Sequence, residues 1–469
     1  MQVLPESFKQ NMKDLLGDEK FHLFESSFSE EPVSALRINP LKKKTENSAD
    51  IFTIMELEQI PYEKNGYYFK AEHTPGRRPF HDAGVYYIQD PGAMVPGAIL
   101  TQSEFFCKMN ETGKGMKIID LCASPGGKST QIAQAMAGKG ILFTNEINKA
   151  RADVLSSNIE RMGIENAIVL NESTDKLAER FEGYFDAVIV DAPCSGEGMF
   201  RKDPGAIAEW TPESVNVCAE RQAQILENAF RMLRPGGALV YSTCTFEKEE
   251  NEDRVQALIS AHPEMNLEDI SYIKDKAPGC ADGLAPLEKS IRLMPGSFKG
   301  EGQYAALLSK EGDSESALPF GGFEMSSKIK DMKALEVFLK AVLKESAMRR
   351  ILDAKDRFRL FGDNLYIMPE DTPSLSGLKV LRCGLCIGNF KKDRFEPGHA
   401  LALTLGKEDV NLFIDTDENT AESFVRGMTL EGEGSGWCLV GACGYSLGWG
   451  KASGGKVKNH YPKGLRIQG

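Results

Sequence analysis

Residues 116–148, MKIIDLCASPGGKSTQIAQAMAGKGILFTNEIN, decide the fold class of this chain. The apolar segment Lys117–Leu121 has the pattern of a buried strand, and a turn with two glycines follows it. Lys128–Ala137 then has the spacing of an amphipathic helix, and a second apolar segment occupies Gly140–Asn145. A strand, a helix and a further strand in this order are typical of a parallel sheet.

The same alternation continues to about residue 310. Further strand candidates lie at Ala167–Leu170, Phe185–Asp191 and Ala238–Thr243, and helical patterns occupy Lys149–Met162 and Glu213–Leu233. The pattern predicts an α/β fold with a doubly wound, mainly parallel sheet. Ligands of such sheets bind beyond the carboxyl ends of the strands.

A chain of 469 residues is long enough for several domains. We expect a mixed α/β extension at residues 1–105, which begins with helical patterns at Glu6–Leu16 and Glu19–Phe28. The core should occupy 106–310, and a linker with a basic helical segment should occupy 311–376. Residues 377–469 are rich in glycine and strand-like patterns, which indicates a separate β-rich domain.

Composition narrows the function classes. The net charge of −12 argues against a protein that coats nucleic acid unspecifically. Because no apolar run is long enough for a membrane span or signal peptide, we expect a soluble, cytoplasmic protein with no membrane partner. The ten cysteines are too sparse for a disulfide scaffold, which favours reduced thiols.

The last residues of the chain are locally basic. Lys451, Lys456, Lys458, Lys463 and Arg466 occur there without an acid, interleaved with Trp449, His460 and Tyr461. Two interpretations stay open, an RNA-facing surface and a solvated tail.

The glycine turn, Cys122–Lys128, resembles a phosphate-binding loop at first sight. That loop requires a glycine five residues before its Gly-Lys pair, where this chain has Cys122, and the pattern G-x-G-x-x-G is also absent. The glycines still allow close approach of a ligand to a helix N-terminus. Glu146, after the next strand, could accept hydrogen bonds from ribose hydroxyls, as an adenosine cofactor requires, although an exposed glutamate at a helix start is the alternative.

Two cysteines follow two predicted strands. Cys194 lies in VDAPCSGEGMFRKDP and Cys244 in VYSTCTF, so neighbouring strands about 4.8 Å apart would bring both thiols to one planar substrate. A thiolate can add reversibly to carbon 6 of cytosine, which activates carbon 5 for methylation. Asp191 could neutralise charge near ring nitrogen 3, and the second cysteine or a water could take the proton from carbon 5. The alternative is that both cysteines are buried hydrophobic residues.

Other cysteine pairs suggest zinc only weakly. Cys383 with Cys386, and Cys438 with Cys443, lie in apolar, strand-like surroundings and lack a histidine at metal spacing. We therefore expect no metal site.

Several motifs resemble the Sun-type RNA 5-methylcytosine methyltransferases, and within them the bacterial ribosomal enzymes. The matching stretches are DLCASPGGKST, NEINKAR, DAPCSGEGMFRKDP, LRPGGALVYSTCTF with the following EEN, ALRINPLK, YYIQDPGA and the closing KNHYPKGLR. They extend the resemblance over nearly the whole chain, and the pair DAPCSG and STC is highly specific.

The resemblance implies a class I, Rossmann-like methyltransferase core, an N-terminal extension and a C-terminal PUA-like domain that helps to dock RNA. It implies that S-adenosylmethionine is held by Cys122, Ala123, Ser124, Pro125, Gly126, Gly127, Lys128, Glu146 and Asp191. Cys244 would be the nucleophile and Cys194 would promote release. Ser173 stands where relatives have an aspartate that contacts adenosine, and Glu172 or backbone groups could take over that contact.

The implied substrate is cytosine in the decoding region of 16S rRNA, as free RNA or in the 30S subunit, without an obligate protein partner. One alternative is a ribosome-assembly factor that binds RNA and whose methylation is incidental. Another is a methyltransferase acting on tRNA or DNA cytosine. A DNA enzyme would use Cys194 as its nucleophile and would leave Cys244 unexplained.

Overall fold

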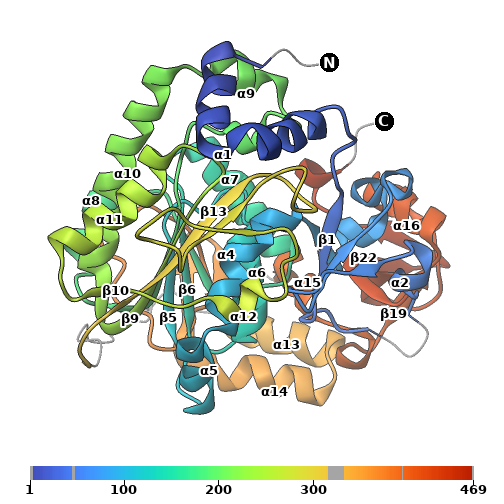
Figure 1. The fold of residues 1–469 in the computed structure, drawn as a ribbon. Helices are drawn as coiled ribbons and strands as arrows, with labels where there is room; N and C mark the ends of the chain where they lie inside the picture. Colours follow the sequence, from blue (N-terminus) through green and yellow to red (C-terminus); the bar gives the residue numbers. More distant parts are fainter. Residues whose placement is uncertain (1–3, 45–47, 315–331, 393, 467–469) are drawn as a thin grey trace.

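The computed structural model describes residues 4–44, 48–314, 332–392 and 394–466. Its centre is a ten-stranded sheet in the order β11-β12-β13-β9-β8-β5-β6-β7-β16, with β10 paired to β13 (Figure 1). The parallel strands are β5 (Lys117–Asp120), β6 (Ile141–Asn145), β7 (Ala167–Leu170), β8 (Phe185–Asp191) and β9 (Leu233–Thr243). This confirms the predicted strands, although β9 begins at Leu233, where helix had been expected.

Antiparallel strands extend the sheet at both edges. Beyond β9 lie β13 (Gln303–Lys310), β12 (Ile291–Leu293), β11 (Ala281–Asp282) and β10 (Met265–Leu267). At the other edge, β16 (Val380–Cys383) pairs with β7. The boundary predicted at residue 377 therefore precedes a strand that belongs to the core sheet.

Helices cover both faces of the sheet (Figure 1). One face packs on α4 (Pro91–Gln102), α6 (Gly127–Met136) and α7 (Lys149–Arg161); the other packs on α8 (Thr174–Arg180), α10 (Pro212–Met232) and α11 (Glu252–Ala261). Ile118 belongs to the first apolar cluster and its neighbour Ile119 to the second. Since both faces are buried, the parallel strands are apolar throughout, which is why the sequence pattern predicted them. Shorter helices are α5 (Glu104–Glu111), α9 (Pro204–Glu209) and α12 (Ser271–Lys274).

The N-terminal region combines a long helix with a small sheet. The element α1 (Glu6–Ser27) consists of two helical segments separated by a kink at Gly17, whose φ is 73°, and this confirms the two predicted helices. The sheet order is β2-β3-β1-β4. Its elements are β1 (Ala35–Ile38), β2 (Glu58–Gln59), β3 (Gly66–Tyr68) and β4 (Tyr86–Ile88), with short helices α2 (Ile51–Ile54) and α3 (Pro79–Asp82). Phe8 and Phe24 of α1 pack on Phe200, Trp210 and Phe246 of the core.

The C-terminal region contains two further sheets. Two helices, α13 (Met332–Val342) and α14 (Glu345–Asp353), lie within residues 311–376, where a linker with a basic helical segment was predicted. The first sheet contains β14 (Phe358–Phe361), β15 (Asn364–Ile367), β17 (Leu385–Lys391) and β18 (Arg394–Pro397). The second contains β19 (Phe413–Thr416), β20 (Leu430–Glu431), β21 (Gly436–Ala442), β22 (Tyr445–Ser453) and β23 (Lys456–Asn459). Helices α15 (His399–Thr404) and α16 (Glu418–Val425) accompany them, and most of the predicted linker, from residue 315 on, lies outside the described residues.

Two absences apply to the described ranges only. Among their helices, none is both long and apolar enough to cross a membrane. Their His, Cys, Asp and Glu side chains form no cluster of three or more that could hold a metal ion.

Candidate active site

A cavity of about 270 Å³ lies beyond the carboxyl ends of β5, β8 and β9. We call it the cysteine cavity, because Cys244 is part of its wall. Its lining comes from the segment Tyr87–Ala93, the glycine turn, the ends of β8 and β9 with Met199, and Glu301–Gln303. In the sheet, β5 has β6 on one side and β8 on the other, so the cavity lies at the switch point where such folds bind ligands.

The glycine turn is held in place by α7. Arg151 donates to the Ser124 carbonyl at 3.1 Å, and Asn158 donates to the Pro125 carbonyl at 2.8 Å. Gly126 has a φ of 115°, a backbone conformation that favours glycine. A Cβ atom at Gly127 would lie 3.1 Å from the Gln89 side-chain nitrogen. The backbone therefore favours glycine at position 126, and Gln89 leaves little room for a side chain at position 127.

The N-terminal sheet reaches this turn through Arg37, from the motif ALRINPLK. The guanidinium is fully buried and donates to Gln134 at 2.8 Å, to Thr130 at 2.7 Å, to the Gly127 carbonyl at 3.2 Å and also to Gln89. Burial lowers the pKa of Arg37 to about 10, so it stays charged near neutral pH. The start of α6 thus depends on a side chain from another domain.

Asp120 lies at the end of β5 and lines the cysteine cavity. Ser129 donates to its Oδ2 at 2.6 Å, whereas Oδ1 has no hydrogen-bond partner among the described residues. Burial raises the pKa of Asp120 to about 7. A buried carboxylate oxygen without a partner is costly unless a ligand donates to it, so Asp120 is a candidate ligand contact.

Lys128 and Asp191 form an ion pair across the cavity wall. The Lys128 Nζ atom lies 2.7 Å from Asp191 Oδ2, and the two side chains are 8% and 32% exposed. Asp191 Oδ1 accepts from the Ser242 hydroxyl at 2.8 Å and from Gln303 at 3.4 Å. The carboxylate is therefore fixed in orientation by three neighbouring donors.

The two cysteine sulfurs are in contact. Strands β8 and β9 pair in parallel, with Asp191 opposite Ser242, and the Cys194 and Cys244 Sγ atoms lie 3.2 Å apart. The hydrogen bond with Cys244, together with burial, raises the pKa of the Cys194 thiol well above its usual range. Cys244 lines the cysteine cavity, whereas Cys194 is not among its lining residues, so Cys244 is the cysteine more accessible to a molecule in the cavity.

A buried network joins the loops that carry the two cysteines. The Ser195 and Thr245 hydroxyls are 2.7 Å apart, and Thr245 donates to Glu197 Oε2 at 2.7 Å. Glu197 also accepts from the Phe246 backbone N–H at 2.9 Å and from Trp210 at 2.9 Å. Burial raises the pKa of Glu197 to about 8. The distance between the sulfurs is thus set by side chains of both loops.

Glu250, in the EEN motif, holds the Cys194 loop from the other side. The backbone N–H of Ser195 donates to Glu250 at 3.1 Å, and Gln222 donates to Glu250 at 2.6 Å and to the Pro193 carbonyl at 3.0 Å. Helix α10, which carries Gln222, thereby positions Cys194 without contributing to the cavity lining.

Most of the predicted site residues meet at this cavity. Cys122, Ala123, Ser124, Pro125, Gly127, Lys128, Asp191 and Cys244 line it, Gly126 shapes the turn, and Cys194 contacts Cys244. Glu146 and Ser173 do not line it. Glu146 accepts from the Asn148 backbone N–H at 2.9 Å and lies 3.4 Å from Arg151, and Ser173 caps α8 by accepting from the Lys176 N–H.

The lining residues that were not predicted from the sequence include Asp90, Asp120, Glu301 and Gln303. Asp90 lies in YYIQDPGA, where the motif itself was a signal. Glu301 and Gln303 lie at the start of β13, which is antiparallel to β9. Because an antiparallel strand begins where its neighbour ends, residues at its amino end can also line a site at the carboxyl ends of the parallel strands.

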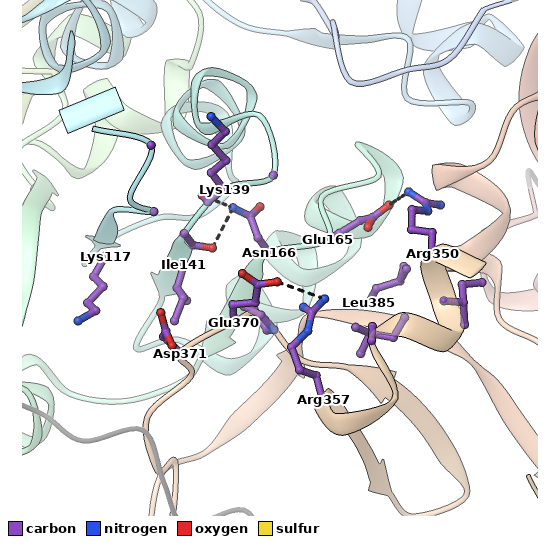
Figure 2. Close-up of a pocket in the computed structure, with 18 residues that line it drawn as sticks. Lys117, Lys139, Ile141, Glu165, Asn166, Arg350, Arg357, Glu370, Asp371 and Leu385 are labelled. Carbon is purple, nitrogen blue, oxygen red and sulfur yellow. Dashed lines mark hydrogen bonds and ion pairs between the residues drawn. The ribbon is translucent and has the colours of Figure 1, made fainter. Parts of the chain in front are cut away.

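A second cavity of about 410 Å³, here called the far cavity, lies near the amino ends of β5 and β6 (Figure 2). It separates the core from α14, β15 and β17. Arg350 pairs with Glu165 at 3.1 Å, and Arg357 lies 3.6 Å from Glu370, as Figure 2 shows. Its described lining contains no cysteine, whereas Cys244 lines the smaller cavity.

Comparison with protein families gives four consecutive matches. They are the 16S rRNA methyltransferase RsmB/F (residues 108–309), the N-terminal domain of 16S rRNA methyltransferase RsmF (4–91), the RsmF rRNA methyltransferase first C-terminal domain (338–405) and the methyltransferase RsmF PUA domain (411–467). These matches confirm the Rossmann-like methyltransferase core and the PUA-like domain expected from the sequence.

Individual proteins agree with these matches. Ribosomal RNA small subunit methyltransferase F of Vibrio vulnificus (strain YJ016) is 30% identical over 98% of this chain and 97% of its own length. The protein with the same description from Shewanella piezotolerans is 29% identical over 98% and 96%. The crystal structure of PH0851 superposes with a TM-score of 0.57 at 26% identity over 66% of each chain. That of NSun6 from Pyrococcus horikoshii with SFG has a TM-score of 0.55 at 22% identity over 66% of this chain and all of that chain.

Proposed function

The chain belongs to the RsmF family of 16S rRNA methyltransferases, and from this premise we propose that it methylates carbon 5 of cytosine in the decoding region, through a covalent bond between Cys244 and carbon 6. The chain is an rRNA methyltransferase, and its cofactor is S-adenosylmethionine. When bound, this cofactor supplies an electrophilic methyl group. The position of the methyl group, the adduct and the rRNA region are the proposed part.

The residues around the glycine turn fit such a cofactor. Its sulfonium and amino groups are cationic, and Asp120 offers a buried carboxylate oxygen that has no protein partner in the described structure. The segment Cys122–Lys128 allows close backbone approach at Gly126 and Gly127. We assign the binding role to these residues, with Glu146 and Ser173 as predicted contacts to the adenosine half.

We assign the nucleophilic role to Cys244. Cys244 lines the cysteine cavity, and the Cys194 sulfur lies 3.2 Å from its sulfur, so Cys244 is the thiol placed to add to a base in the cavity. Addition of that thiolate to carbon 6 forms the carbon–sulfur bond and moves electron density into the ring. Lys128 and Asp191, fixed by their ion pair, stand at the wall where charge near ring nitrogen 3 would develop.

Release requires the reverse chemistry. The proton on carbon 5 must pass to a base, and its electron pair then expels the Cys244 thiolate from carbon 6. Cys194, whose sulfur lies 3.2 Å from that of Cys244, is the group we assign to assist this step. The contact between the Cys194 and Cys244 sulfurs, beside the cysteine cavity, is the main support for the proposed covalent mechanism.

The C-terminal domain supports RNA docking rather than chemistry. Lys451 and Lys458 are exposed and opposite each other on β22 and β23, and the His460 ring lies 4.5 Å from that of Trp437. Trp449 and Tyr461 are buried, so the aromatic part of the predicted RNA-facing surface lies partly in the domain core. The exposed basic residues remain suited to phosphate contacts.

The test is methyl transfer to defined RNA. We expect the purified chain to transfer label from S-adenosylmethionine to 16S rRNA or to 30S subunits, and to form 5-methylcytidine, identified by mass spectrometry of the nucleosides. Formation of a different methylated nucleoside would contradict the proposed position. No incorporation into either substrate would favour the assembly-factor alternative.

A further inference from the structure

A glutamate in the wall of the cysteine cavity has no assigned role. Glu301 immediately precedes Gly302 and β13, and it lines the same cavity as Cys244 and Asp191. The residue is 2% exposed, and neither carboxylate oxygen has a hydrogen-bond partner within the described ranges. Buried carboxylate oxygens that accept no hydrogen bond are uncommon in proteins, and a molecule bound in the cavity could donate to them.

The positive and negative charges around Glu301 are equal in number. Arg201 Nη1 lies 3.7 Å from its Oε2 and Lys202 Nζ lies 3.7 Å from its Oε1. Lys202 also pairs with Asp90 at 2.6 Å, and the Glu301 backbone N–H donates to Asp90 at 3.2 Å. Two cations thus face two carboxylates. This balance disfavours a phosphate ligand and leaves Glu301 free to accept hydrogen bonds from a neutral group.

Asp191 is less able to accept a further hydrogen bond. One of its oxygens is paired with Lys128, and the other accepts hydrogen bonds from Ser242 and Gln303. Among the carboxylates that line the described cavity, Asp120 adjoins the glycine turn, and Asp90 already accepts from Lys202 and Glu301. Glu301 is therefore the acceptor available to a base held between the cysteines and this wall.

Cytosine and uracil differ at carbon 4, where a hydrogen-bond acceptor can distinguish them. Cytosine has a donating amino group at carbon 4, whereas uracil has an accepting oxygen there. A buried acceptor pairs with the amino group and is left unpaired against the oxygen, a difference that can reach about 10⁴-fold in rate. We propose that Glu301 accepts a hydrogen bond from the 4-amino group of the target cytosine and so selects cytosine over uracil; this inference rests on the proposed function.

The test combines protein variants with a substrate variant. Wild type, Glu301→Leu and Glu301→Gln are compared in single-turnover methyl transfer to RNA with cytidine, or its 4-deoxy analogue, at the target position. Removing the amino group should slow wild type at least about 100-fold. Glu301→Leu should be slowed about as much on cytidine, with little further loss on the analogue, because the contact is already absent. Glu301→Gln, which keeps one acceptor, should recover part of the rate.

Controls separate this inference from folding and from the proposed function. S-adenosylmethionine binding by each variant reports folding, and Glu58→Gln, an exposed glutamate paired with Lys299, should behave as wild type. If Glu301→Leu fails to bind cofactor, the test rests on Glu301→Gln. Replacing cytidine by its 4-deoxy analogue should then slow Glu301→Gln by a smaller factor than it slows wild type. If Glu301→Leu lost the same factor in rate on both substrates, the inference about Glu301 would be overturned, and the proposed function would stand. A wild-type protein that forms no 5-methylcytidine would overturn the proposed function and this inference with it.

Discussion

The two cavities at opposite ends of the central sheet differ in how their charged groups are satisfied. The far cavity is larger, about 410 Å³, and its arginines Arg350 and Arg357 have carboxylate partners. The cysteine cavity is smaller, about 270 Å³. Its residues Asp120 and Glu301 keep buried oxygens that accept no hydrogen bond in the described structure, although Arg201 and Lys202 each lie 3.7 Å from a Glu301 oxygen. Volume alone would favour the far cavity. Buried groups without hydrogen-bond partners, beside a cysteine, favour the cysteine cavity as the proposed site.

Breaking the ion pair of the cysteine cavity should have the largest effect. Lys128→Met leaves Asp191 without its cation, and we expect methyl transfer to slow about 100-fold or more in single-turnover assays. Lys108→Met removes an exposed lysine of α5 that is paired with Glu104, and should change the rate less than twofold. Equal rates for the two variants would mean that the ion pair has no role in the reaction.

Loss of the Arg37 hydrogen bonds that hold the glycine turn should have the second-largest effect. Arg37→Met removes four donated hydrogen bonds from a buried site, so the free energy of unfolding in urea should fall by about 3 kcal/mol. Arg394→Met, at an exposed pair with Glu396, should lower it by less than about 0.5 kcal/mol. A small loss for Arg37→Met would show that the N-terminal sheet does not stabilise the turn.

The network that spaces the cysteines should respond to pH. Burial raises the pKa of Glu197 from 4.5 to about 8, so the folded protein holds a proton that the unfolded chain has lost. Its contribution to stability is therefore present below about pH 4.5 and is lost as the pH rises through about 8.

Urea unfolding at pH 5 and pH 8 (roughly the two ends of that range) measures this contribution. Wild type should lose more stability than Glu197→Gln between the two, because glutamine does not titrate. Glu345→Gln, an exposed acid at the start of α14, should keep the wild-type difference. Identical losses in wild type and Glu197→Gln would contradict the protonation of Glu197.

Changes in the far cavity should have the smallest effect. Arg350→Ala breaks a half-exposed pair with Glu165 and should leave methyl transfer within about twofold of wild type. The free energy of unfolding should fall by less than about 1 kcal/mol. A loss of activity comparable to that of Lys128→Met would show that the far cavity takes part in the reaction.

The core was predictable because its strands are buried on both faces, so that neighbours such as Ile118 and Ile119 are both apolar. Residues 303–310 are also apolar, but their pairing with β9 depends on an antiparallel return that no local pattern specifies. Glu301 and Gln303 were missed for that reason. Trp449 was grouped with the basic residues of a possible RNA-facing surface or solvated tail, whereas the five-stranded sheet that contains β22 buries its side chain.

The cysteines themselves were predictable from their motifs, but the residues that hold them were not. Gln222 contacts the Pro193 carbonyl from α10, and Glu197 reaches Phe246 and Trp210. These contacts join segments far apart in the sequence, so they follow from tertiary packing. The domain boundaries stay predictions, since β16 crosses from the C-terminal region into the core sheet.

The most direct test of the account is the covalent adduct formed by each cysteine variant. Wild type, Cys244→Ala and Cys194→Ala are incubated with S-adenosylmethionine and 16S rRNA and separated on denaturing gels. Cys194→Ala should accumulate a protein–RNA adduct, because the Cys244 thiolate can still add to carbon 6 while release is slowed. Cys244→Ala should form neither adduct nor methylated RNA. An adduct that accumulates with Cys244→Ala and not with Cys194→Ala would contradict the assignment of the nucleophile.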